Sequence, residues 1–135
     1  MRFRDKYWFL SNMYPCPVTY KGVTYKCAES AYQAQKCANE TDKQRFANID
    51  GFKAKKRSHT MACIPMEEWF AKSLQVMAEI EQAKYRQNPE LLTRLHRIKG
   101  EIAEDNSWGD RFWGRCDGKG ENHLGRILMQ IRDQA

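Results

Sequence analysis

Alternating hydrophobic and polar residues mark one strand pair near the amino terminus. Val18–Tyr20 and Val23–Tyr25 carry β-forming residues on the two sides of Lys21-Gly22. Two alternating runs joined by a two-residue turn that contains glycine are typical of a β-hairpin. The pattern therefore predicts a short hairpin, and it is the clearest strand signal in the chain.

Helix-forming residues dominate the sequence that follows. The segment AESAYQAQKCA predicts a helix over about 28–39 because alanine, glutamate, glutamine and lysine favour helices. Thr41 and Gln44 have the spacing of a capping box, which predicts a short helix ending near residue 47. A further helical piece is predicted from Gly51 through about residue 60.

A long helix is predicted from Pro65 to about Gln87. Its apolar residues recur with a helical period at Met66, Trp69, Phe70, Met77 and Ile80. Asn88-Pro89 then begins another helix, because asparagine caps helices and proline is favoured at their first position. Gly100 is expected to end that helix.

The last third of the chain combines a glycine-rich loop with one more helix. Residues 101–104 are predicted to be extended, and the loop runs on to Asn122, the expected cap of the final helix. That helix has a predicted buried face of Leu124, Ile127, Leu128 and Ile131. With no repeat or linker visible, we expect one α+β domain over 1–135, mainly α-helical with a small N-terminal β-hairpin.

Composition narrows the classes of function. The 135 residues contain no run of about 20 apolar residues, which a membrane helix needs, and no secretory signal. Five cysteines without a C-x-x-C pair favour reduced thiols, and the three histidines lack metal-ligand spacing. We therefore expect a cytoplasmic protein without a metal. The net charge of +6 favours an anionic, phosphate-bearing partner.

Three groups of residues are candidates for chemistry. On the helix after the hairpin, Glu29, Tyr32 and Lys36 fall within about 60° of arc at 100° per residue, so a carboxylate, a phenol and an amine converge. The alternative is that Glu29 complements the helix start, Tyr32 packs and Lys36 is solvated. The other two groups are a tryptophan-, aspartate- and glycine-rich loop and a basic helix, with the residues Trp108, Asp110, Trp113, Asp117, Lys53, Lys55, Lys56 and Arg57.

These two further groups also have structural explanations. Tryptophan can stack on a heterocycle and aspartate can transfer protons, yet both residue types also build turns and cores. The basic helix suits a phosphate group, but such a cluster is more often a solvated charged face.

Eight segments, in order along nearly the whole chain, resemble the NADAR family pattern. They are FLSNMYP, the hairpin, AESAYQAQK, GFKAKK, EEW, KYRQNPEL, DRFWG and GENHLGRILMQIR. Each segment is weak alone, but their joint order and spacing are specific. The sequence departs from the pattern at Met13, at Lys26-Cys27, at Ser30 and at Arg115-Cys116, and these departures bear on substrate choice.

The resemblance implies an N-glycosidase that acts on ribosylated pyrimidine intermediates of riboflavin synthesis or removes ADP-ribose from guanine, including guanine of DNA. No cofactor is implied. By motif match, the catalytic positions are Glu29, Lys36 and Asp110. The expected substrate contacts are Asn12, Tyr32, Arg57, Trp69, Trp113, Gly114 and Asn122, although Asn122 also fits a purely capping role.

Two routes of bond cleavage fit these residues. In the first route, Glu29 and Asp110 divide two tasks, one stabilising the positive charge on the sugar and the other supplying a proton to the base. In the second route, the Lys36 amine attacks C1′ and forms a Schiff base. The alternative class is a non-catalytic nucleotide or nucleic-acid binding module. The sequence has no RNP motif, zinc-finger spacing or heptad-bearing basic helix to support that alternative. Oligomeric state is open.

Overall fold

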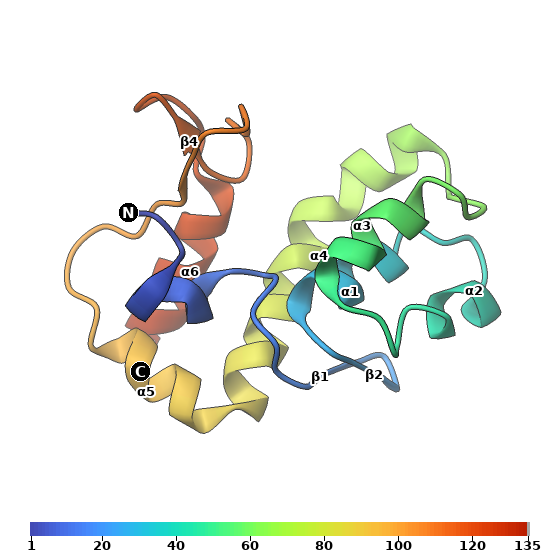
Figure 1. Ribbon diagram of the computed structural model, residues 1–135, viewed down its shortest axis with the longest axis horizontal. Helices are drawn as coiled ribbons and strands as arrows, with labels where there is room; N and C mark the ends of the chain where they lie inside the picture. The colour runs from blue at the N-terminus through green and yellow to red at the C-terminus, as the bar shows by residue number, and fades with distance from the viewer. Residues whose placement is uncertain (135) are drawn as a thin grey trace. The chain divides into compact units, whose positions relative to one another are not determined.

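The computed structural model describes residues 1–134 and divides into two compact units (Figure 1). One unit, here the central unit, comprises Asn12–Asn88. The other, the terminal unit, joins Met1–Ser11 to the chain from Pro89 onwards. The helices and small strand pairs confirm the predicted α+β class.

The central unit begins with the predicted hairpin. Strand β1 (Val18–Tyr20) pairs antiparallel with β2 (Val23–Tyr25). Both turn residues have positive φ, 48° at Lys21 and 83° at Gly22, which is the conformation that a two-residue hairpin turn of the primed type requires. The free edge of β1 is covered by Gln87, whose side-chain amide bonds both the N–H and the carbonyl of Thr19 at 2.7 and 2.9 Å.

Helix α1 (Ala28–Ala34) follows the hairpin and is entirely buried. It is shorter than predicted because Gln35 and Lys36 form a turn and Cys37 then pairs with Cys63 in an isolated antiparallel bridge. Helix α2 (Glu40–Gln44) is present, but the capping box at Thr41 is wrong. Asn39 is the cap, and its side chain accepts the N–H of Asp42 at 2.9 Å.

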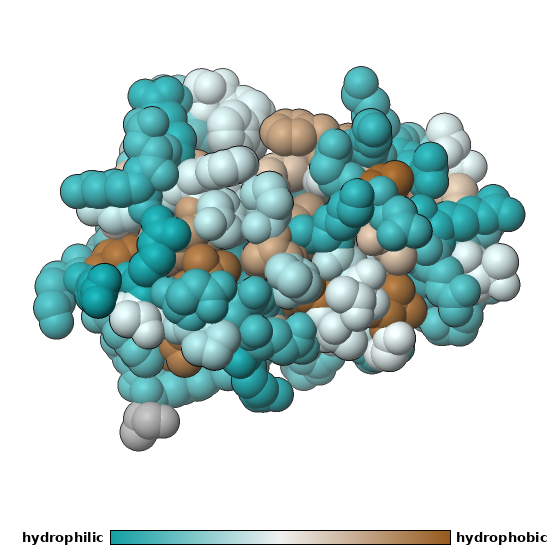
Figure 2. Space-filling view, turned by 60° about the horizontal axis from the view of Figure 1, so that its bottom comes forward, coloured by the Kyte–Doolittle hydropathy of each residue, from teal (hydrophilic) through white to brown (hydrophobic). Residues whose placement is uncertain are grey.

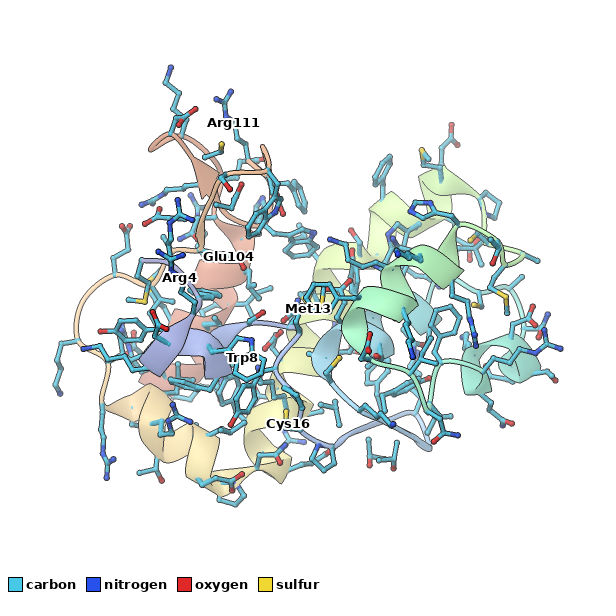
Figure 3. All side chains as sticks on the ribbon, in the orientation of Figure 1. Arg4, Trp8, Met13, Cys16, Glu104 and Arg111 are labelled. Atoms are coloured by element: carbon cyan, nitrogen blue, oxygen red, sulfur yellow. The ribbon has the colours of Figure 1, made fainter. Side chains whose placement is uncertain are left out.

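Helix α3 (Gly51–Ser58) is capped by Asp50, which accepts the N–H of Lys53 at 2.9 Å, and packs across α1 (Figure 1). Position 51 has little room for a side chain. A Cβ there would collide with the sulfur of Met13 and lie 3.0 Å from the Cβ of Glu29. Met13, labelled in Figure 3, therefore lies at this helix junction.

Helix α4 (Met66–Gln87) confirms the long predicted helix. Its predicted stripe is only partly buried: Trp69, Met77 and Ile80 are in the core, whereas Met66 and Phe70 are 71% and 68% exposed. In the first two turns, Trp69 and Ser73 are buried and the other residues are partly or fully exposed. The helical period identified the face of α4 that is buried, but it did not show that this face is exposed near the start of the helix.

The terminal unit contains a 3-10 helix η1 (Asp5–Leu10), helix α5 (Pro89–His96), strands β3 (Asp105–Asn106) and β4 (Arg115–Cys116), and helix α6 (His123–Asp133). β3 and β4 are parallel, and residues 101–104, predicted to be extended, belong to no strand. α5 and α6 pack together over a core of Leu10, Leu91, Leu95, Ile102, Leu124 and Leu128.

Helix α6 begins where predicted but is not capped by the side chain of Asn122. This residue is left-handed, with φ 55°, and its side-chain amide donates to the carbonyl of Ile102 at 2.9 Å. The first N–H groups of α6 instead donate to backbone carbonyls: His123 to Phe112 at 3.1 Å and Leu124 to Trp113 at 3.0 Å. The loop therefore caps the helix.

Within residues 1–134 no helix is long and apolar enough to span a membrane. The face drawn in Figure 2 is largely hydrophilic, with separate small hydrophobic areas.

Candidate functional site

Glu29 is held in the first turn of α1 although its side chain is only 8% exposed. Its backbone N–H donates to the carbonyl of Asn12 at 2.9 Å. Its carboxylate accepts a 2.6 Å hydrogen bond from the side-chain amide of Gln33, one helical turn on. Burying a carboxylate costs less free energy when a donor binds it, so the Gln33 amide stabilises Glu29 in this position.

Lys36 lies in the turn that follows α1, where its side chain is half-buried. Its ammonium is 5.6 Å from the ring centre of Tyr32 and 5.8 Å from that of Trp69. The two rings meet edge to face, with centroids 5.1 Å apart. Tyr32 comes from α1 and Trp69 from α4, so two helices build one aromatic corner around the amine.

Burial lowers the pKa of Lys36 from its usual value, and the negative charge of Glu29 opposes that effect. Glu29 is therefore near enough to Lys36 for its charge to act on that pKa, although α1 ends at Ala34 and Lys36 lies in the following turn, not on the helix as the spacing argument assumed. A lysine with a lowered pKa has a larger fraction of neutral, nucleophilic amine at neutral pH.

Sequence reasoning missed Glu81, on α4. It is completely buried, and burial raises its pKa to about 7, with Lys84 lowering it and Glu29 raising it. Neither of its carboxyl oxygens has a hydrogen-bond partner within residues 1–134. The sequence did contain a signal for this residue, because Glu81 follows Met77 by one helical turn and so falls on the predicted buried face of the long helix.

Two further buried acceptors belong to the same unit. The side-chain oxygens of Asn12 and Gln33 have no hydrogen-bond partner within the described part of the chain. The amide nitrogen of Asn12 contacts the sulfur of Met77 at 3.5 Å, and that of Gln33 binds Glu29. Unsatisfied buried acceptors are costly, and their concentration beside Glu29 is typical of a functional site.

Arg57, at the exposed end of α3, donates to the carbonyl of Arg45 at 3.1 Å. This contact fixes the guanidinium between α2 and α3. It gives Arg57 a structural partner while leaving it on the basic face that the sequence indicated.

The terminal unit holds the other predicted residues. Asp110 accepts hydrogen bonds through one carboxylate oxygen from the N–H groups of Phe112 and Trp113, at 3.0 and 2.9 Å. The side chain of Asn106 makes two hydrogen bonds to the backbone of Asp110: its oxygen accepts the Asp110 N–H at 3.0 Å, and its amide donates to the Asp110 carbonyl at 2.8 Å. Asp110 therefore organises the turn on which Trp113 is presented.

Three rings pack at the start of α6. The ring centroid of Phe112 is 4.9 Å from that of Trp113 and 4.5 Å from that of His123. His123 was not among the residues selected from the sequence. Gly114 is required there, because a Cβ would collide with the carbonyl of Glu104. Arg115, one of the departures from the family pattern, binds the carboxylate of Glu101 with both terminal nitrogens, at 2.7 and 3.0 Å.

The predicted residues thus form two groups. The central unit gathers Asn12, Glu29, Tyr32, Lys36 and Trp69, with Arg57 on its basic face; the terminal unit gathers Asp110, Trp113, Gly114 and Asn122. Asn122 is buried against Ile102. The meeting of Glu29, Lys36 and Asp110 around one sugar stays a prediction.

Residues 1–134 contain no group of three or more histidine, cysteine, aspartate or glutamate side chains arranged to hold a metal ion. An open hollow of about 590 Å³ lies on the central unit, lined by the hairpin and its neighbours, including Pro15, Tyr25, Lys26 and Asn48. It is separate from the residues that carry the chemistry described above.

These features define a class of small α+β protein. In it, a buried carboxylate, Glu29, lies on one helix, and a half-buried amine, Lys36, lies in the turn that follows. The NADAR domain matches residues 2–135, and the chain belongs to the NADAR family.

Curated relatives fall into two named groups. The chain is 32% identical over 132 residues to "Riboflavin biosynthesis protein VVA0006" of Vibrio vulnificus, covering 96% of this chain but only 36% of that protein. It is 29% identical over 132 residues to "N-glycosidase YbiA" of Escherichia coli, covering 96% of this chain and 82% of that protein.

A solved structure shares the fold. The NMR structure of the E. coli protein YbiA has a TM-score of 0.84 and 27% sequence identity, over 99% of this chain and 83% of that one. The fold class expected from the sequence is therefore confirmed both by the helices and strands and by this likeness.

Proposed function

We propose that this chain is an N-glycosidase that hydrolyses the bond between a base and C1′ of a phosphate-bearing ribose. The observation that carries the proposal is the half-buried amine of Lys36 beside the rings of Tyr32 and Trp69, with the charge of Glu29 near enough to act on its pKa. Relatives named N-glycosidase, similar along most of this chain, support the same reaction class.

Glu29 is the acid that faces the sugar in this proposal. When the glycosidic bond breaks, the bonding electron pair leaves with the base and positive charge grows at C1′ and the ring oxygen. The carboxylate stabilises that charge and accepts a proton from water as the water oxygen bonds to C1′. The hydrogen bond from Gln33 fixes the orientation of the carboxylate.

Lys36 offers a second route. Its neutral amine attacks C1′, the base departs, and ring opening leaves an imine between Nζ and C1′. Water then hydrolyses the imine, which releases the sugar and restores the amine. The lowered pKa of Lys36 supports this route, because only the unprotonated amine is a nucleophile.

Asp110 is proposed as the proton donor to the departing base, with Trp113 stacking on that base and Gly114 allowing close approach. Asn12 has a buried oxygen without a hydrogen-bond partner in residues 1–134, which suits a ribose hydroxyl. Arg57 and the neighbouring lysines of α3 supply positive charge for phosphate, and Tyr32, Trp69 and Asn122 complete the proposed contacts.

Two substrate classes remain in the proposal. One is the ribosylated pyrimidine phosphates of riboflavin synthesis, favoured by the names of the Vibrio relative and of a maize relative, "Riboflavin biosynthesis protein PYRR, chloroplastic". The other is ADP-ribosylated guanine, free or in DNA. Both present phosphate to the basic face and suit a cytoplasmic enzyme that works without a cofactor.

The test is to incubate the protein separately with each substrate class and to detect the released base by mass spectrometry. Release from one class assigns the substrate. Tight binding of both without release would support the alternative, a non-catalytic nucleotide-binding module. Borohydride added during turnover distinguishes the routes: a sugar adduct on Lys36 supports the imine, and turnover without an adduct supports direct attack by water.

A further inference from the structure

Cys37 and Cys63 face each other across the isolated bridge that ends the turn after α1. The bridge is closed by two backbone hydrogen bonds, from Ala38 N–H to the carbonyl of Ala62 at 3.0 Å and from Ile64 N–H to the carbonyl of Lys36 at 2.9 Å. Both bonds are made by the neighbours of the two cysteines. The cysteines themselves therefore form a non-hydrogen-bonded antiparallel pair.

This pairing brings the two thiols within disulfide range. In a non-hydrogen-bonded antiparallel pair the Cα atoms are about 4.5 Å apart and the side chains are on the same side of the ladder. A disulfide needs Cα atoms separated by about 4.4–6.8 Å. Both residues are free thiols in this structure, so the backbone is already arranged for a bond that has not formed.

The two thiols differ in access. Cys63 is exposed, and its sulfur makes only weak hydrogen bonds, at 3.4 Å each, to the carbonyls of Ser58 and Met61. Cys37 is 2% exposed, and burial raises its pKa to about 11, with the neighbouring Cys63 adding to the rise. An oxidant therefore meets Cys63 first, and Cys37 is shielded until its neighbour has reacted.

We propose that Cys37 and Cys63 form a reversible, intramolecular disulfide when the protein meets a peroxide. The thiolate of Cys63 attacks one peroxide oxygen, which gives a sulfenic acid and releases water from hydrogen peroxide. The thiol of Cys37 then attacks the Cys63 sulfur, giving up its proton as the S–O bond breaks, and the hydroxyl leaves with that proton as a second water. Two thiols lose two electrons and two protons, and one peroxide becomes two waters.

The bond joins two segments that frame the aromatic corner. Cys37 directly follows Lys36, and Cys63 lies three residues before Met66, the first residue of α4, the helix that carries Trp69. Oxidation ties the turn that holds Lys36 to the chain entering α4 and closes a loop containing α2 and α3. This modification site is independent of the reaction proposed above.

The test uses the wild-type protein, reduced, freed of reductant and exposed to hydrogen peroxide. Remaining thiols are alkylated, the protein is digested without reduction, and the peptides are identified by mass spectrometry. The expected product is one peptide pair joined through Cys37 and Cys63, with both residues lost from alkylation and recovered after dithiothreitol. Cys16, Cys27 and Cys116, all buried, are internal controls that should stay reduced.

A Cys37→Ser variant separates the two steps. Its Cys63 should stop at the sulfenic acid, which dimedone traps, and no internal crosslink should form. The proposal is overturned if wild-type Cys63 becomes sulfinic acid while Cys37 remains alkylatable, or if Cys63 pairs mainly with another cysteine. Because the crosslink is read on the wild-type chain, the conclusion stands even if the variant folds poorly.

Discussion

Gln33 donates a 2.6 Å hydrogen bond to the buried carboxylate of Glu29 from one turn further along α1. The same pairing of residue types recurs on the surface of α4, where Gln75 donates to Glu79 at 2.7 Å. Both pairs are four residues apart and differ in burial, but the order of the two residue types is reversed, and Glu79 also accepts a 2.6 Å hydrogen bond from the hydroxyl of Tyr20. The exposed pair is therefore a comparison for the loss of one glutamine donor at the surface, where Tyr20 still binds the carboxylate.

Replacing Gln33 with alanine should destabilise the fold and reduce turnover. The change leaves a buried carboxylate with one donor fewer, which costs about 1–3 kcal/mol. Urea denaturation measures the loss. Gln75→Ala removes the exposed counterpart and should change the free energy of unfolding by less than about 0.5 kcal/mol. Equal effects of the two substitutions would contradict a special role for the buried bond.

Lys36 should react with amine reagents at a lower pH than an ordinary lysine. Its pKa is lowered by burial, so the neutral amine that reacts is present at a pH where a fully solvated lysine is still protonated. The check is the pH dependence of acetylation at Lys36, followed by peptide mass spectrometry. A midpoint at or above the usual lysine value would show that the Glu29 charge outweighs burial.

Glu81 should make the protein less stable as pH rises. Its pKa is raised from 4.5 in the unfolded chain to about 7 in the fold, so between these values the folded state holds a proton that the unfolded state has lost. Stability from this group is complete below pH 4.5 and falls until about pH 7, by roughly 3 kcal/mol in total.

The Glu81→Gln variant cannot ionise at this position, so it should lack that loss. Urea denaturation of both proteins across the pH range measures the difference. The free energy of unfolding of the variant, relative to that of wild type, should rise progressively towards neutral pH and stay constant above it. Parallel stability curves for the two proteins would show that Glu81 ionises normally in the fold.

Gly51→Ala should disturb the junction of α1 and α3. The new Cβ collides with the sulfur of Met13 and presses on the Cβ of Glu29, and overpacking of this kind costs about 1–3 kcal/mol. Shortening the neighbour, in the double variant Gly51→Ala with Met13→Ala, should recover part of the loss. Thermal denaturation of the four proteins of this cycle measures the coupling, and strict additivity would argue against the contact.

Asp110 can be tested by a substitution that preserves its turn. Asparagine retains an oxygen that accepts the N–H groups of Phe112 and Trp113, whereas alanine removes it. If Asp110 donates a proton to the base, Asp110→Asn should fold normally and lose activity by about 10²-fold or more. Full activity in this variant would restrict Asp110 to its structural role.

Local sequence signals predicted much of the fold. The hairpin at Lys21-Gly22 and the beginning of α4 after Pro65 depend on neighbouring residues alone, and both are present. The early end of α1 could not be predicted, because it depends on the pairing of Cys37 with Cys63, distant in sequence.

The same distinction applies to the candidate site. Helical spacing predicted that Glu29 and Lys36 share one environment; the charge of Glu29 does act on the pKa of Lys36, but Lys36 lies in the turn after α1, so their meeting at one site stays a prediction. The burial of Glu81 depends on what covers α4, which periodicity does not reveal. The cap of α6 was misjudged for a similar reason, since carbonyls from a distant loop replace the side chain of Asn122.

The central claim is that Glu29 performs chemistry on a ribosyl bond, and one comparison tests it most directly. Wild type and Glu29→Gln are incubated with the ribosylated substrate that wild type cleaves best, and free base is counted by mass spectrometry. The amide keeps the size of the side chain and a hydrogen-bonding oxygen but removes the negative charge. We predict a loss of about 10²-fold or more with the fold intact. Base release at the wild-type rate by a folded Glu29→Gln protein would contradict the account.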